Sequence, residues 1–325
     1  MKATTARRFP IKKIVSGAAL LLFAAMLAAL PRQCAAACAE GIALWAKAVL
    51  PSLLPFLAVS TLLAARGKKA ADRLAPLMRR VKLPAPASLC LLLSVLSGYP
   101  VGSRAVAELA ERGGIPREGV LRTAVLCSTS GPMFLLGTVG GMYDNPAAGA
   151  VLFASHLAGV FLVCLLLLPF AKKLPESPPH EKQEESIPSL GESVQRAVLS
   201  VLCVGGFVAL FYVLGEMLAA LGALRALTAA LSVPLSPFGA QPLAEGLAYG
   251  LLEATHGCAA LASAGGPLAL PLTAFVVTFG GGSILAQQLS FLSPAGVNAP
   301  LFVAVKAAQG AAAFFVCLLL TRMFL

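Results

Sequence analysis

Two ionisable side chains, Glu253 and His256, lie three residues apart inside an otherwise apolar stretch of the sequence. At this spacing both would project from the same face of a helix. Ionisable groups within membrane segments are costly and face a cavity or a partner, so the pair is a candidate binding site. An E-x-x-H pair also occurs in di-iron bundles, but those bundles need two such pairs and two further carboxylates. We therefore expect no metal site and no cofactor.

Three further stretches combine hydroxyl groups with glycine or proline, namely 97–103, 128–132 and 279–283. Glycine and proline interrupt a helix, and the freed backbone groups must then meet water, protein or a ligand. Side chains at such breaks add further hydrogen-bonding groups. The candidate solute-binding residues are Ser97, Gly98, Tyr99, Ser103, Ser128, Ser130, Glu253, His256, Ser283 and Gln287.

These features also have structural interpretations. The first break would be a packing kink followed by Arg104, which can pair with Glu108 at i,i+4. The hydroxyls of 128–132 would satisfy the freed carbonyls themselves, and His156 would be a hydrogen-bonded core histidine. A hydrolase that pairs Ser130 with His156 is a third hypothesis. Because H-E-x-x-H, G-x-S-x-G, Walker A and dinucleotide-binding motifs are absent from the sequence, we predict that the protein is not an enzyme.

The elements that carry these residues are predicted to cross a membrane. The 325 residues are 58% apolar and 12% charged, whereas a soluble domain has about a quarter of its residues charged. This composition excludes a water-soluble enzyme and predicts an all-α polytopic membrane protein. The net charge of +11 would suit a nucleic-acid-binding protein, but the cations lie between apolar segments, as in cytoplasmic loops. We expect the lipid bilayer as a partner and no nucleic acid.

The chain divides into two similar halves. Val163–Leu167 (VCLLL) recurs as Val316–Leu320, an offset of 153 residues (316 minus 163), and the breaks at Gly98 and Ser130 have counterparts near Ala254 and Gly281. Interrupted segments at corresponding places in two halves indicate a transporter-type binding site. The predicted divisions are an N-terminal segment with the first span (1–41), a first repeat (42–171), a cytoplasmic linker (172–193) and a second repeat (194–325).

Loop charge predicts how the halves are oriented. The loop 66–82 carries seven cations against Asp72 alone and should be cytoplasmic, whereas the loop 222–241 holds only Arg225 and should face outward. If 86–108 and 242–263 are re-entrant hairpins, each half crosses three times and the repeats are inverted; if both segments span, the total rises from seven crossings to nine. The seven spans are 14–31, 42–65, 119–142, 147–170, 194–221, 268–292 and 300–324. We expect a multi-pass protein of the cell membrane with a cytoplasmic N-terminus and with Cys34 and Cys38 in a loop after the first span.

Five motifs in order resemble the YlbJ-type sporulation integral membrane proteins. They are Pro51–Phe56 (PSLLPF), Leu96–Ser103 (LSGYPVGS), Cys127–Phe134 (CSTSGPMF), Gly250–Gly257 (GLLEATHG) and Phe279–Gln287 (FGGGSILAQ). This family carries a nucleoside recognition or gate domain that is similar to part of the concentrative nucleoside transporters. The resemblance covers the chain from about residue 42 to its end. No nucleoside-contacting residue can be transferred by position.

The resemblance implies a membrane protein of endospore-forming Firmicutes that is needed for spore formation and has a transporter-like core. Together with the paired breaks, it predicts that the core binds or moves a nucleoside-like or other small polar solute, with or without a coupling ion. The alternative is a structural or assembly protein of the spore-forming membrane that transports nothing. The substrate and a homo-oligomeric state are left open by the sequence.

Overall fold

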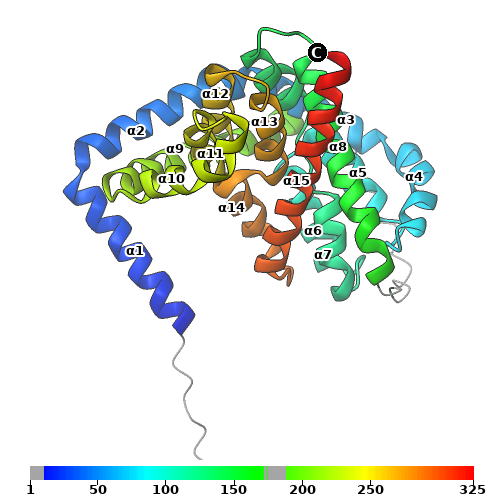
Figure 1. Cartoon of the computed structure of the whole chain (residues 1–325). Coiled ribbons are helices and arrows are strands. Elements are labelled where there is room, and N and C mark those ends of the chain that lie inside the picture. Colours follow the sequence, from blue (N-terminus) through cyan, green and yellow to red (C-terminus); the bar gives the residue numbers. More distant parts are fainter. Residues whose placement is uncertain (1–10, 172–173, 175–187) are drawn as a thin grey trace, which may run out of the picture.

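The computed structural model describes residues 11–171, 174 and 188–325, and the regular elements in these ranges are all helices (Figure 1). Five helical stretches in the described part are long and apolar enough to cross a membrane: Pro31–Leu63, Ala148–Phe170, Leu190–Ala220, Ala269–Leu292 and Ala299–Phe324. Large apolar side chains on these helices, among them Leu166 and Phe315, are more than 60% exposed. Such a surface is suited to lipid, and the predicted all-α polytopic class is confirmed.

The N-terminal helices differ from the prediction. Helix α1 (Ile11–Ala29) is followed directly by α2 (Pro31–Leu44), a π-helical turn η1 (Trp45–Val49) and α3 (Leu50–Arg66). The expected loop around Cys34 and Cys38 is wrong, because both thiols lie in α2 and are free. Proline at the first helical position and an alanine-rich sequence favour a helix there even though its hydropathy is modest. Figure 1 shows α1 leaving the helical body at an angle to α2.

The remaining helices form two series along the chain, before and after the predicted linker. After α3 come α4 (Lys68–Arg80), α5 (Ala87–Ser97), α6 (Val101–Glu111), α7 (Arg117–Leu126), η2 (Met133–Val139), η3 (Gly140–Met142), α8 (Ala148–Leu167) and η4 (Leu168–Phe170). The second series is α9 (Leu190–Ala220), α10 (Ala223–Leu235), η5 (Ser236–Phe238), α11 (Leu243–Leu252), α12 (Ala254–Ala264), α13 (Ala269–Phe279), α14 (Gly281–Leu292) and α15 (Ala299–Phe324). The opposite orientation of the two series in a membrane stays a prediction.

Two segments of the chain double back on themselves. In hairpin 1, formed by α5 and α6, Gly102 lies against Ser94; in hairpin 2, formed by α11 and α12, Gly250 lies against Gly257. Each arm has 10 or 11 residues and is therefore about 16 Å long. That length is about half of a 30 Å hydrocarbon core. Neither 86–108 nor 242–263 is one continuous spanning helix, which agrees with hairpins and disagrees with the nine-span alternative.

The predicted loops 66–82 and 222–241 are mostly helical. In α4 the apolar residues Ala71 and Met78 are buried, whereas Arg73, Arg79 and Arg80 are exposed. This helical spacing of apolar residues suits a helix that lies along a surface, and an average of hydropathy over the segment conceals it. Helix α9 begins at Leu190, inside the predicted linker 172–193; residues 172–173 and 175–187 of that linker lie outside the described ranges.

Candidate functional site

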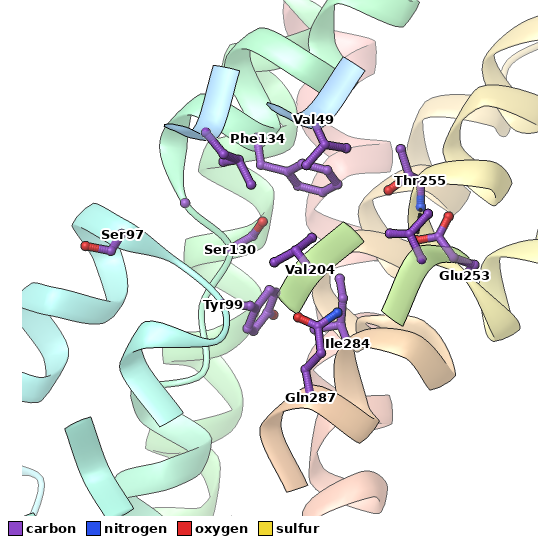
Figure 2. A pocket seen from close by; sticks show the side chains of 13 residues that line it. Val49, Ser97, Tyr99, Ser130, Phe134, Val204, Glu253, Thr255, Ile284 and Gln287 are labelled. Atoms are coloured by element: carbon purple, nitrogen blue, oxygen red, sulfur yellow. Dashed lines mark hydrogen bonds between the residues drawn. The ribbon is translucent and has the colours of Figure 1, made fainter. Parts of the chain in front are cut away.

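A buried cavity lies where both hairpin tips meet the breaks of the two interrupted helices; we call it the central cavity. The predicted site residues at its wall are Ser97, Tyr99, Ser130, Glu253 and Gln287. They come from hairpin 1, the break after α7, hairpin 2 and α14, so both halves of the chain contribute (Figure 2). Apolar side chains complete the wall, namely Val49, Leu53, Phe134, Val204, Val208 and Ile284. The cavity volume is about 40 Å³.

The tip of hairpin 1 depends on a glycine. Gly98 has a φ of +73°, and a Cβ atom at this position would lie 2.3 Å from the backbone nitrogen of Gly131. Glycine is therefore required both by the backbone conformation and by the close approach to the break of the neighbouring helix. Next to it, the hydroxyl of Ser97 forms a 2.9 Å hydrogen bond with that of Ser60 in α3.

The break after α7 is held by side chains from other elements. The hydroxyl of Ser94 in hairpin 1 donates to the carbonyl of Cys127 and accepts from the backbone N–H of Thr129. The backbone N–H of Ser130 donates to Nε2 of His156 over 2.8 Å. The structural interpretation proposed that the hydroxyl groups of 128–132 bond the freed backbone groups themselves. These bonds come from other elements instead. Helix α8 and hairpin 1 supply them.

His156 links the breaks of the two halves. Because its Nε2 accepts the N–H of Ser130, a neutral ring carries its proton on Nδ1, which then donates to the hydroxyl of Thr278 over 2.9 Å. The ring is fully buried, as predicted for a hydrogen-bonded core histidine. Its Nε2 lone pair is occupied and not available as a base toward the hydroxyl of Ser130. This arrangement does not favour the hydrolase hypothesis.

Glu253 and His256 separate around the start of α12. The carboxyl oxygens of Glu253 accept the backbone N–H groups of Thr255 (3.1 Å) and His256 (2.7 Å), so this side chain is the N-cap of the helix. Glu253 is 3% exposed and reaches the central cavity. The His256 ring stacks between Tyr212 (4.6 Å) and Tyr249 (4.1 Å) and is not part of the cavity wall. Of the predicted pair, only the carboxyl group faces the cavity.

Three other predicted residues form a layer behind the cavity. The hydroxyl of Ser103 lies 3.3 Å from that of Ser128 and donates to Oε1 of Gln288 over 3.2 Å. Ser283, near the start of α14, is buried, and its hydroxyl has no hydrogen-bond partner within the described part of the chain. These serines support the wall and do not line it. The Arg104–Glu108 pair forms as predicted, with 2.8 Å between Nε and Oε1.

Lys306 is the residue that the sequence analysis missed. It lies in α15 and is fully buried. Its Nζ donates to the carbonyl of Ser128 (2.8 Å) and to the hydroxyl of Tyr99 (3.1 Å), and it lies 5.3 Å from the centre of the Tyr99 ring. The available signal was a single lysine within the apolar segment 300–324.

The chain is 26% identical over 341 aligned positions to the sporulation integral membrane protein YlbJ of Bacillus subtilis (strain 168). The alignment covers 95% of this chain and 83% of that protein. No family model matches the chain, and no solved structure matches it. The similarity along almost the whole chain confirms the resemblance to the YlbJ-type sporulation integral membrane proteins.

Proposed function

We propose that this YlbJ-like membrane protein acts in sporulation and that its core binds a small polar solute or an ion in the central cavity and carries it across the membrane. The proposed role is not enzymatic. The observation that carries it is the convergence of both hairpin tips, the break after α7 and helix α14 on one cavity with a carboxyl group in its wall. Irregular backbone at membrane depth is tolerated only where protein or a cavity surrounds it.

The repeated order of helices supports a transport cycle. In secondary transporters, solute sites lie near the middle of the membrane between internal repeats, at helices that are interrupted there. The proposal takes the two halves as inverted, with a cytoplasmic N-terminus and the cationic segment 66–82 on the cytoplasmic side. The cavity would then be reached alternately from either face as the hairpins move relative to the long helices.

The cavity wall also limits the ligand. The carboxyl group of Glu253, the hydroxyls of Tyr99 and Ser130 and the amide of Gln287 suit a ligand with several hydrogen-bond donors, such as a nucleoside-like solute, or a small cation. The volume of about 40 Å³ accommodates only a few water molecules or an ion. Pockets that enclose drug-sized ligands have roughly 300–1,000 Å³. A nucleoside-like solute therefore requires the hairpin tips to move apart.

Ligand-dependent thermal stability tests this proposal. The purified full-length protein is heated in the presence of individual nucleosides, other polar metabolites and inorganic ions, and any ligand that raises the Tm is then followed in an uptake assay with proteoliposomes. We expect the Glu253→Gln/Ser130→Ala double variant to lose the response. The control Glu245→Gln changes an exposed carboxyl group of α11 and should retain it. A lack of any ligand response, together with normal sporulation of cells that carry the double variant, would falsify the proposal.

A structural or assembly role in the spore-forming membrane is the second candidate. It is favoured by the exposed arginines of α4, which offer a contact surface away from the central cavity. In this case, substitutions at the helix breaks that keep the net charge leave sporulation unchanged. Substitutions of the charged residues in 66–82 or in the linker 172–193 disrupt sporulation instead. The same sporulation assay therefore separates the two candidates.

A further inference from the structure

A fully buried lysine lies in the interior of a predicted membrane span. Lys306 is the eighth residue of α15 and has no exposed surface. Charged side chains at membrane depth are costly and pair with opposite charges or with backbone carbonyls. Within the described residues, no carboxylate lies at ion-pair distance from its Nζ, and its hydrogen bonds go to neutral oxygens. The ammonium group therefore has a specific set of ligands without a counter-ion.

These ligands belong to the two irregular segments of the first half. The carbonyl of Ser128 is free because the helix is broken at this point, and the hydroxyl of Tyr99 lies at the tip of hairpin 1. One ammonium group thus joins the broken helix to the hairpin. In transporters with broken helices, the unwound carbonyls commonly hold a sodium ion. In this protein, the ammonium group of Lys306 binds the same kind of carbonyl oxygen.

The surroundings of the ammonium are those of a structural group and not of a ligand-binding one. Its titratable neighbours are Tyr99 and, on α8, His156 and Cys164, none of which has a carboxyl group. His156 is held in a neutral form by accepting the N–H of Ser130. Lys306 is not part of the central cavity wall, whereas Tyr99 is. A solute in the cavity would meet Tyr99 and not the ammonium.

We propose that Lys306 is a tethered cation: its ammonium group takes the place of a bound alkali metal ion between Ser128 and Tyr99, and the fold consequently needs no sodium ion at this position. The inference concerns how the core is held together. It does not depend on whether the protein transports a solute.

Chemical replacement of the side chain tests this inference. Glu253→Gln, Lys306→Ala and Lys306→Met are purified as full-length proteins, and their Tm is measured in choline chloride, sodium chloride and propylammonium chloride at equal ionic strength. Propylammonium has the same heavy atoms as the part of the lysine side chain that alanine lacks. The methionine side chain fills most of that space without charge, so Lys306→Met is the matched control.

We expect Glu253→Gln, which keeps Lys306 but lacks the carboxyl group of the central cavity, to have the same Tm in all three salts. Lys306→Ala should lose several degrees in choline and regain most of them in propylammonium, with a smaller gain in sodium, whereas Lys306→Met should regain none. A saturable rise in the Tm of Glu253→Gln with sodium, but not with choline, would overturn the proposal, because this variant lacks the carboxyl group of the central cavity and sodium would then bind elsewhere. So would an alanine variant that responds to the cations no more than the methionine variant does.

If Lys306→Ala yields no folded protein in choline, it is prepared in propylammonium throughout. Recovery of folded protein there supports the proposal. Failure in propylammonium while Lys306→Met folds overturns it. The sodium titration of Glu253→Gln requires no change at Lys306 and decides independently.

Discussion

Hairpin 1 and hairpin 2 have the same place in the two halves, but their tips are stabilised in different ways. At hairpin 1, Gly98 lies against the backbone of Gly131, and Tyr99 receives a hydrogen bond from Lys306 of α15. At hairpin 2, the carboxyl group of Glu253 caps the second arm of the same hairpin. In both hairpins the arms touch directly, and the tip lies against the break of a neighbouring helix: at hairpin 2 a Cβ atom on Gly281 would lie 2.5 Å from the carbonyl oxygen of Gly250.

The difference lies in the hydrogen bonds: hairpin 1 is anchored by other elements, whereas hairpin 2 is self-supported in that it caps its own second arm. The tip of hairpin 1 depends on the break after α7 and on α15, so a movement of either element should disturb it. In hairpin 2, the carboxyl group of Glu253 accepts the free backbone N–H groups in the first turn of the second arm. In the proposed transport cycle hairpin 2 is therefore the better candidate to move as a unit, and it would carry the Glu253 carboxyl group with it.

Substitution of Gly98 should have the largest effect. In Gly98→Ala the new Cβ atom meets the backbone of Gly131 at 2.3 Å, and this contact is relieved only if the hairpin and the break separate. Gly265→Ala is the matched control, because Gly265 has a similar conformation (φ +68°, ψ −165°, against +73° and −158°) but nothing within 4 Å of a Cβ atom. Backbone strain of about 1–3 kcal/mol is common to both variants.

We expect Gly98→Ala to be destabilised by about 3 kcal/mol more than Gly265→Ala, which is the scale of overpacking in a filled core. The measurement is the yield of monodisperse protein and its Tm in detergent. Equal losses in the two variants would mean that hairpin 1 is not anchored against Gly131, and the contrast between the hairpins would disappear.

Replacement of the Glu253 carboxyl group by an amide should have an intermediate effect on stability, confined to hairpin 2. In Glu253→Gln only one oxygen remains for the two backbone N–H groups of Thr255 and His256, so one donor loses its acceptor at a cost of about 1–3 kcal/mol. Hydrogen–deuterium exchange should accelerate in the first turn of α12 and remain unchanged in hairpin 1. The exposed control Glu245→Gln should change stability by less than about 0.5 kcal/mol. Faster exchange at the tip of hairpin 1 would show that hairpin 2 is not self-supported.

Much of the site was predictable because helix breaks are encoded locally. Glycine and proline interrupt a helix through their own stereochemistry, so the interruptions at Gly98 and Gly280 were found directly from residue types. The prediction that Glu253 faces a cavity had the same basis, since a carboxyl group in an apolar segment has few alternatives. The repeated order of helices then brought these positions together.

The features that the sequence did not predict depend on contacts between segments that are distant along the chain. His256 shares the apolar segment of Glu253, but Tyr212 of α9 and Tyr249 of α11 stack on its ring outside the cavity wall. The role of Lys306 arises because Ser128, 178 residues away in sequence, has a free carbonyl next to it. The sequence predicts loops in place of surface helices such as α4, because the charges in these segments hide a helical spacing of apolar residues.

The smallest expected effect concerns the hydroxyl groups behind the cavity and compares the two arms of hairpin 1. Ser103 in α6 forms only long contacts, 3.2 Å to Gln288 and 3.3 Å to Ser128, whereas Ser94 in α5 bonds both backbone groups of the break at Cys127 and Thr129. Ser103→Ala should therefore cost less than about 1 kcal/mol, and Ser94→Ala about 1–3 kcal/mol because it leaves buried backbone groups without partners. Thermal unfolding of the two variants side by side measures the difference. If Ser103→Ala were as damaging as Ser94→Ala, the hydroxyl layer and not the backbone of the break would anchor hairpin 1, and the dependence of that hairpin on Lys306 would weaken accordingly.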